Sequence, residues 1–261
     1  MALDLATRAD LVALRPDGSS RPVERPFAPE IPVALEYNGL SYAVMMASPS
    51  DLEDFVTGFA LTEGLAQSVD DLVGLDLAET DKGWIARATI TSLPIEQLAE
   101  RVRTRVAESS CGLCGIDNLD AIAKPLPPVA PHKPIERTAI FKALDDVRGH
   151  QPGNRATGGM HAAAFVSPQG EIICVREDVG RHNALDKLIG AMARVGRSLA
   201  DGFILSTARC SYEIVEKAVR AGATTLVTIS VPTSMAAERA RAAGLSLFAL
   251  ARPDEILSVV P

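Results

Sequence analysis

A chain of 261 residues, 47% hydrophobic and 23% charged, is long and apolar enough to fold as one large globular domain or two unequal ones. Its formal net charge of −7 argues against a general nucleic-acid-binding protein, because no basic field is present to replace the counterions of phosphate groups. The N-terminus lacks the pattern of a signal peptide, and no run reaches the roughly 20 apolar residues of a membrane span, so we expect a cytoplasmic protein with reduced cysteines.

The first 30 residues differ in character from the segment that follows them. Residues 1–30 are polar and interrupted by prolines, which predicts an irregular leader. Two apolar segments then follow, Ile31–Glu36 and Leu40–Met46, and they flank Asn38-Gly39, a pair typical of the type I′ turn. The sequence therefore predicts a β-hairpin directly after the leader.

The rest of the segment 31–107 combines helical and extended patterns. A helix with one apolar face is expected after Ser50, which fits a capping box with Glu53. Trp84–Thr91 alternates between apolar and polar residues as a half-buried strand does, and Ile95–Val106 has a helical pattern. Together with the hairpin, these elements predict a small α+β domain.

Residues 108–134 predict a connector between two domains. Its first half contains Cys111-Gly-Leu-Cys114, in which a glycine follows each cysteine. Its second half holds five prolines that should keep it extended and semi-rigid: Pro125, Pro127, Pro128, Pro131 and Pro134. The cysteine pair is therefore expected at a domain junction, where mobile segments often carry function, although an ordinary linker has the same composition.

Residues 135–261 alternate between helical and apolar strand patterns. The expected helices are Ile135–Arg148, His182–Val195, Tyr212–Arg220 and Ser234–Ala243, and the expected strands are Ala162–Ser167, Glu171–Arg176, Gly202–Ser206, Thr224–Ser230 and Leu245–Leu250. This order predicts an α/β domain with a mixed, mainly parallel sheet, one antiparallel hairpin and helices on both faces.

Ligands of such sheets bind beyond the carboxyl ends of the strands. That rule selects four segments, three of them unusually polar: Thr157–His161, Arg176–Asn183, Ser206–Ser211 and Leu250–Glu255. In the first, Gly158 and Gly159 allow a ligand to approach closely, and their backbone N–H groups can hold phosphate. A tight turn and a core histidine at His161 are the alternative interpretation.

The segment Arg176–Asn183 is the densest in polar groups and falls where a strand ends and a helix begins. Asp178, Arg181, His182 and Asn183 bring an acid, a bidentate cation, an imidazole and an amide to one helix N-terminus. Such a set suits a polar heterocycle and an anionic group. The alternative is an N-cap with solvated charges, but one capping residue would suffice for that.

The cysteine pair Cys111 and Cys114 has three interpretations. A structural zinc site needs a second close pair of ligands, and Cys174 and Cys210 are isolated. A dithiol–disulfide exchanger would place the motif at the start of a long helix, which Gly115 disfavours. A sulfur carrier would hold a terminal sulfur on one thiolate and release it by exchange with the second thiol. The spacing alone leaves relay and redox open.

Taken together, several motifs resemble the FdhD/NarQ family of accessory sulfurtransferases for formate dehydrogenase. They are Gly58-Phe-Ala-Leu-Thr-Glu-Gly64, Cys111-Gly-Leu-Cys114-Gly, Thr157-Gly-Gly-Met-His161-Ala, Arg176-Glu-Asp-Val-Gly-Arg-His-Asn-Ala-Leu-Asp-Lys187 and Ser206-Thr-Ala-Arg-Cys-Ser-Tyr-Glu-Ile-Val-Glu-Lys217. The resemblance covers nearly the whole chain beyond the leader. It implies a cytidine-deaminase-like three-layer α/β/α domain after a smaller α+β domain.

The resemblance also implies a function. Members of the family accept sulfur from a cysteine desulfurase as a persulfide and pass it to the molybdenum cofactor, a bis(molybdopterin guanine dinucleotide), which formate dehydrogenase requires. By position, Cys111 would carry the persulfide and Cys114 would be its partner. A homodimer is expected, with no nucleic acid and no membrane among the partners. His161-Ala-Ala163 lacks the glutamate of zinc deaminases, which argues against zinc-dependent deamination despite the fold, and no structural metal is expected.

By the same resemblance, the guanine nucleotide ends of the cofactor would bind in the polar loops. The residues concerned are Gly158, Gly159, His161, Asp178, Arg181, His182, Asn183, Leu250, Ala251, Arg252, Pro253, Asp254 and Glu255. In the last stretch Arg252 matches the family, but Pro253 and Glu255 replace its glycine and its second basic residue. The main rival function is a non-catalytic chaperone that binds a guanine nucleotide or the molybdenum cofactor.

Overall fold

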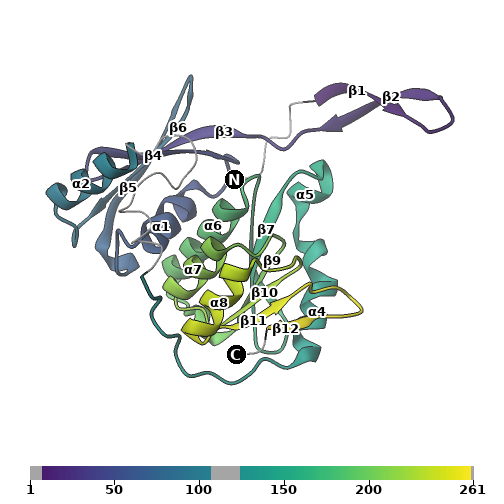
Figure 1. Ribbon diagram of the computed structural model, residues 1–261. Helices are drawn as coiled ribbons and strands as arrows, with labels where there is room; N and C mark the ends of the chain where they lie inside the picture. The colour runs from purple at the N-terminus through teal and green to yellow at the C-terminus, as the bar shows by residue number, and fades with distance from the viewer. Residues whose placement is uncertain (1–7, 107–123, 260–261) are drawn as a thin grey trace.

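The computed structural model describes residues 8–106 and 124–259 and contains three β-sheets (Figure 1). The N-terminal region comprises β1 (Arg8–Leu14), β2 (Ser20–Pro26), β3 (Ile31–Tyr37), β4 (Leu40–Ala47), α1 (Leu52–Thr62), η1 (Val69–Asp71), β5 (Leu72–Thr80), β6 (Gly83–Ile90) and α2 (Ile95–Val106). The C-terminal region comprises α4 (Arg137–Val147), η2 (Arg148–His150), α5 (Pro152–Thr157), β7 (His161–Val166), β8 (Ile172–Asp178), α6 (Arg181–Arg194), η3 (Leu199–Asp201), β9 (Phe203–Ser206), α7 (Tyr212–Arg220), β10 (Thr225–Thr228), α8 (Ser234–Ala243), β11 (Ser246–Ala249) and β12 (Leu257–Val259).

The prediction of an irregular leader over residues 1–30 is wrong for its described part. Strands β1 and β2 form an antiparallel hairpin in register from Arg8 opposite Pro26 to Leu14 opposite Ser20. The prolines misled the prediction, because proline is tolerated in a strand that lacks a neighbour on one side, and this sheet has only two strands. Figure 1 shows the hairpin extending away from the rest of the chain. The domain boundaries stay a prediction.

The second sheet has the strand order β4-β3-β6-β5 and forms the body of the N-terminal region. The predicted hairpin is confirmed as β3 and β4, and both turn residues, Asn38 and Gly39, have the positive φ angles of a type I′ turn, 49° and 78°. The aromatic side chains of Tyr37, Phe55 and Phe59 lie in the core between this sheet and α1. Strand β5 was not predicted, because its residues are mostly exposed or half-buried at the sheet edge.

The predicted capping box at the start of α1 is wrong. The helix begins at Leu52 after Asp51, which has a left-handed backbone (φ 53°), and no side chain caps its N-terminus. Ser50 is buried, and the carboxylate of Glu53 instead forms an ion pair with Arg194 of α6. The Glu53 side chain that the local pattern assigned to the cap is therefore paired with Arg194, a residue distant in the sequence.

The third sheet is mixed, as predicted, with the order β12-β11-β10-β9-β7-β8. Parallel pairing is confined to β9, β10 and β11. Strand β7 runs antiparallel to both β8 and β9, and β12 adds an antiparallel edge that the sequence did not predict. Parallel pairs are therefore the minority, which corrects the expectation of a mainly parallel sheet.

Helices cover both faces of this sheet, which confirms the three-layer α/β/α architecture (Figure 1). One hydrophobic core joins α6, α7 and α8 to the sheet, with Leu185, Leu188 and Ile214 fully buried. A second core on the opposite face packs Ile140 of α4 against Phe203 of β9. None of the described helices is both long and apolar enough to cross a membrane.

Helices α1 and α6 touch through glycines. A Cβ atom on Gly190 of α6 would overlap the carbonyl oxygen of Asp54 in α1, and one on Gly58 of α1 would overlap the carbonyl oxygen of Asp186 in α6. Both glycines are needed for space, because any larger residue would push the two backbones apart. The N-terminal region and the α/β domain are therefore joined backbone to backbone.

Buried charges surround this crossing. Asp54 accepts hydrogen bonds from Arg176 Nε of β8 (2.8 Å) and from Arg194 Nη1 (2.7 Å). On the other side, Lys217 Nζ of α7 lies 3.0 Å from Asp186 Oδ1 and also donates to Thr62 Oγ1 of α1. Burial opposes the charged ammonium of Lys217, but the carboxylates of Asp186 and Glu63 raise its pKa. Each charge in the junction thus has a partner on another element.

A third ion pair lies at the end of β8. Asp178 Oδ2 is 2.6 Å from Lys187 Nζ, and both side chains are fully buried. Asp178 also accepts a hydrogen bond from the backbone N–H of Ser48, and Lys187 donates to the carbonyl oxygen of Ser48. This pair therefore ties the segment between β4 and α1 to the start of α6.

The described part of the predicted connector, residues 124–134, has no helix or strand and lies along the outer face of α8 and β11. The backbone N–H of Val129 donates to the carbonyl oxygen of Ala243 (2.9 Å), and His132 Nε2 lies 2.9 Å from Ser246 Oγ. Its extended form agrees with the proline content. These contacts fix it to the α/β domain.

The glycine crossing predicts a large effect of Gly190→Ala. Alanine at an ordinary helix position stabilises by about 1 kcal/mol relative to glycine, but here the added methyl must separate two backbones, so we expect a net loss of about 1–3 kcal/mol or more in the free energy of unfolding. Urea denaturation measures it. Gly149→Ala is the control, because nothing lies within 4 Å of its Cβ position. A Gly190→Ala protein as stable as the wild type would contradict the close crossing.

The buried pair predicts that Asp178→Asn costs about 3–5 kcal/mol of unfolding free energy at pH 7, because the ammonium of Lys187 loses its counter-charge. Burial already lowers the pKa of Lys187, so the deficit should narrow as the pH rises and the amine becomes neutral. Denaturation at several pH values, with the exposed Glu171→Gln as control, tests this. Equal losses in the two variants would refute the structural role of Asp178.

Candidate functional site

The predicted loops meet at one edge of the six-stranded sheet. Strands β9, β10 and β11 are parallel and end there, and antiparallel β7 begins there with His161, directly opposite Asp178 at the end of β8. The backbone N–H of Ala162 donates to Thr207 Oγ1 (2.8 Å), and the N–H of Thr207 donates back to the Ala162 carbonyl (2.9 Å). The start of β7 and the loop after β9 therefore form one surface.

The N-termini of α6 and α7 are joined at the same edge. His182 Nε2, on the first turn of α6, lies 3.0 Å from Glu213 Oε2 on the first turn of α7 and 3.5 Å from Ser211 Oγ. The hydrogen bond from His182 lowers the pKa of Glu213, which burial alone would raise. His182 and Glu213 also line a cavity of about 340 Å³ that extends between α1 and α7.

The charge near His161 is predominantly positive. Burial lowers the pKa of His161, and the nearby charges of Arg181, Arg209 and His182 lower it further, against a hydrogen bond to Thr207 that raises it. At neutral pH the imidazole is therefore uncharged and can accept or donate a hydrogen bond. A neutral histidine surrounded by cations suits a ligand that carries its own negative charge.

Arg181 is the residue of this group best placed for an anion. Its Nε atom is buried and has no hydrogen-bond partner among the described residues. A buried guanidinium nitrogen without a partner costs free energy, and an anionic oxygen would satisfy it. No ion pair of Arg181 or Arg209 occurs within residues 8–106 and 124–259, so both charges are available to a ligand.

Two of the predicted ligand-binding residues have other partners. Asp178 is fully buried, and besides Lys187 and Ser48 it accepts a hydrogen bond from the backbone N–H of Gly180 (2.7 Å). The side-chain amide of Asn183 donates to Asp178 Oδ1 (3.0 Å) and to the carbonyl oxygen of Met46 (2.8 Å). These side chains shape the loop that carries Arg181 and His182, and they face the protein interior.

The Gly158-Gly159 pair lies at the end of α5, before β7. Gly158 is the C-terminal cap of α5 with φ 73°, a conformation that favours glycine. A Cβ on Gly158 would lie 2.5 Å from Arg25 Nη2, and one on Gly159 would lie 3.4 Å from the Ala28 Cβ. The segment that leaves β2 therefore passes directly over both glycines.

The last predicted segment follows β11 at the same edge, beyond β10. Leu250 has a left-handed backbone (φ 47°), and its N–H donates to the carbonyl oxygen of Ser230. Ala251 is buried against the sheet, whereas Arg252, Pro253, Asp254 and Glu255 are exposed and form a short turn closed by a hydrogen bond from the Arg252 N–H to the Glu255 carbonyl. No described contact joins this turn to Arg181 or His182, which follow β8, four places from β11 in the strand order.

The cysteines separate into two groups. Cys111 and Cys114, the predicted catalytic pair, lie outside the described residues. Cys210 is fully buried, and burial raises the pKa of its thiol to about 11. Cys174 is half-buried, and burial raises its pKa as well. Neither Cys174 nor Cys210 forms the accessible thiolate that sulfur transfer requires. Within the described residues, no group of three or more His, Cys, Asp or Glu side chains could hold a metal ion.

Sequence reasoning selected the loop that holds Thr207 but missed two residues of this edge, Arg25 and Glu213. A signal existed for Glu213, because it follows that polar loop on the first turn of the predicted helix. No sequence signal pointed to Arg25, because its position over Gly158 depends on the β1–β2 hairpin, a segment that was predicted to be irregular.

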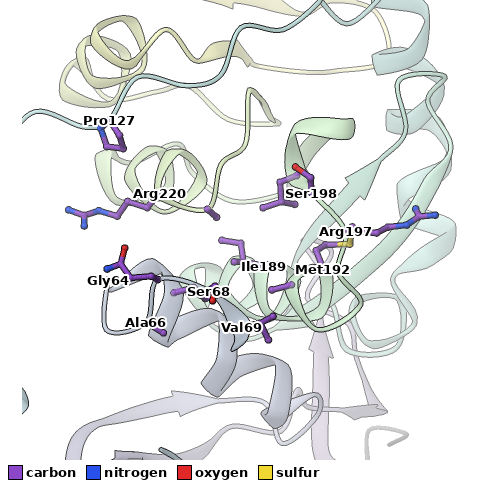
Figure 2. A pocket seen from close by; sticks show the side chains of 15 residues that line it. Gly64, Ala66, Ser68, Val69, Pro127, Ile189, Met192, Arg197, Ser198 and Arg220 are labelled. Atoms are coloured by element: carbon purple, nitrogen blue, oxygen red, sulfur yellow. The ribbon is translucent and has the colours of Figure 1, made fainter. Parts of the chain in front are cut away.

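A separate cavity of about 390 Å³ lies at the opposite ends of the helices (Figure 2). Its apolar lining comes from Leu61 of α1 and from Ile189 and Met192 of α6. Figure 2 shows Arg220, at the end of α7, extending between Pro127 of the connector and the turn after α1. None of the predicted site residues that the structure describes lines this cavity.

Comparison with known proteins identifies relatives over most of the chain. The model of the FdhD/NarQ family matches residues 28–259. A protein named sulfur carrier protein FdhD from Variovorax paradoxus (strain S110) is 40% identical over 230 residues, which cover 88% of this chain and 83% of the relative. The protein of the same name from Bordetella petrii is 40% identical over 225 residues, covering 86% of this chain and 81% of the relative.

A crystal structure agrees with the fold. The structure of a protein assigned as a formate dehydrogenase accessory protein, from Desulfotalea psychrophila, superposes with a TM-score of 0.77 over 98% of this chain and 96% of that one, at 22% sequence identity. Because the family model spans nearly the whole chain and the curated relatives share two fifths of their aligned residues with it, this chain belongs to the FdhD/NarQ family.

Proposed function

We propose that this chain is a sulfur carrier that accepts sulfur from a cysteine desulfurase as a persulfide on Cys111 and transfers it to the molybdenum cofactor, bis(molybdopterin guanine dinucleotide), for formate dehydrogenase. The observation that carries the proposal is the Cys111-Gly-Leu-Cys114 pair inside the region that matches the FdhD/NarQ family, whose curated relatives are named sulfur carrier proteins. The chemistry would make the protein a sulfurtransferase.

The proposed transfer uses ordinary thiol–persulfide exchange. The Cys111 thiolate attacks the terminal sulfur of the donor persulfide, a new S–S bond forms at Cys111, and the donor cysteine leaves as a thiolate. Attack by the Cys114 thiolate on the Cys111 sulfur would then form a disulfide and release the terminal sulfur as hydrosulfide for the acceptor. The other two cysteines do not compete, because burial keeps their thiols protonated.

The sheet edge supplies a site for the nucleotide end of the substrate. Arg181 and Arg209 offer unpaired guanidinium groups, the neutral His161 offers a hydrogen bond, and Glu213 offers a carboxylate. Guanine presents neighbouring N–H donors that a carboxylate can accept, and phosphate oxygens suit guanidinium groups. We place the phosphates near Arg181 and assign Asp178 and Asn183 to the support of the loop.

The sulfur-carrier proposal predicts one removable sulfur atom on Cys111. After incubation with a cysteine desulfurase and cysteine, mass spectrometry should find added sulfur on the peptide that contains Cys111, and a thiol reductant should remove it. Cys111→Ala should abolish loading. Cys174→Ala is the control and should load as the wild type does, since its thiol is half-buried and has a raised pKa.

The rival function, a non-catalytic chaperone for the cofactor, makes the opposite prediction in cells. In a strain that lacks this protein, Cys111→Ala should fail to restore formate dehydrogenase activity if sulfur transfer is the function. Full restoration by Cys111→Ala would reject the carrier and leave the chaperone, because cofactor binding at the sheet edge does not require that thiol.

The nucleotide site predicts that Arg181→Ala weakens the binding of guanosine diphosphate about tenfold or more, because a hydrogen bond between charged groups is worth roughly 1.5–3 kcal/mol. Isothermal titration calorimetry measures the dissociation constant. Arg137→Ala, at the start of α4 on the other face of the sheet, is the matched control. Unchanged affinity in Arg181→Ala would remove this residue from the site.

A further inference from the structure

The hairpin of β1 and β2 is poorly supported by its own contacts. It has only two strands, and Val12 and Leu14 are 60% and 81% exposed. An isolated two-stranded hairpin is marginally stable in water, so its position depends on what its base touches. The hairpin also precedes residue 28, where the match to the family begins, so the family match assigns no role to it.

The base of the hairpin touches the Gly158-Gly159 loop. Arg25 is the second-last residue of β2, and its guanidinium lies against Gly158 so closely that a Cβ there would be 2.5 Å from Nη2. Three residues later, Ala28 lies over Gly159 in the same way. The helix before this loop, α5, is anchored at its start, because the buried Glu177 accepts hydrogen bonds from the backbone N–H groups of Gly153 and Asn154.

The guanidinium group of Arg25 has no partner among the described residues. Its side chain makes no hydrogen bond or ion pair among residues 8–106 and 124–259, although the chain as a whole has more acids than bases. The loop beneath Arg25 leads within three residues to His161, whose pKa is lowered by burial and by Arg181 and Arg209. An exposed cation without a partner that lies over a glycine loop has the arrangement of a phosphate contact.

We propose that the N-terminal hairpin is an arm that completes the nucleotide site, with Arg25 contacting the phosphates of a guanine nucleotide over the Gly158-Gly159 loop. This inference rests on the proposed function, because it adds a phosphate contact to the site at Arg181. It makes Arg25 a binding residue supplied from outside residues 28–259, the region that the family model matches.

The test is the affinity of the full chain for guanosine diphosphate, measured by calorimetry at low and high salt. Arg25→Ala should weaken binding about fivefold, the effect of one partly exposed charge contact. Arg25→Lys should recover part of the loss. The difference should vanish near 1 M salt, where the Debye length falls to about 3 Å. Arg21→Ala is the matched control, because Arg21 is exposed on the same strand four residues earlier, on the same face.

Each other outcome overturns the inference in a recognisable way. Equal affinities for Arg25→Ala and the wild type would show that the arm makes no contact. An equal loss in Arg21→Ala would show a general charge effect, and a loss that persists at 1 M salt would show that Arg25 only holds the loop in place. If the wild-type chain binds no guanosine diphosphate, the nucleotide site of the proposed function fails, and the inference fails with it.

Discussion

The backbone contact between α1 and α6 at Gly58 and Gly190 determines how the two parts of the protein meet. Because neither helix has a side chain at the crossing, the helices approach until a Cβ on Gly58 would lie 2.8 Å from the backbone nitrogen of Gly190. At this separation Asp54 of α1 accepts a hydrogen bond from Arg176 of β8, in the six-stranded sheet. The glycines thus make the ion pairs possible, and the ion pairs fix the angle at which the helices cross.

The same helix, α6, carries the candidate binding residues at its first turn. Its N-terminus presents Arg181 and His182 at the sheet edge, and the buried Lys187 one to two turns later anchors the helix to Asp178 and Ser48. A site built on a helix that is fixed at two points loses little freedom when a ligand binds, which favours affinity. The N-terminal region therefore acts on the site through α6, although its α1 makes no described contact with Arg181.

Local patterns predicted the elements that local forces determine. Helices α7 and α8 have the predicted bounds, and the Asn38-Gly39 hairpin follows from turn chemistry. Contacts between distant residues were not predictable in this way. Asp178 and Asn183 have the side chains of ligand-binding residues, but they are hydrogen-bonded to Ser48 and Met46, which lie 130 and 137 residues earlier in the chain. The short edge strand β12 and the hairpin of β1 and β2 lacked the apolar pattern on which strand prediction depends.

The distribution of charge explains how an acidic protein can present a cationic edge. The buried acids of the junction, Asp54, Asp178 and Asp186, are each paired with lysines or arginines on neighbouring elements, so they contribute little field at the surface. Arg181 and Arg209 have no such partner among the described residues, and their field lowers the pKa of His161. The net charge of −7 disfavours long polyanions such as nucleic acids, whereas a compact anion that enters this edge meets mainly the local guanidinium groups. Selectivity for a small phosphorylated ligand therefore follows from the pairing of the buried acids as much as from the arginines themselves.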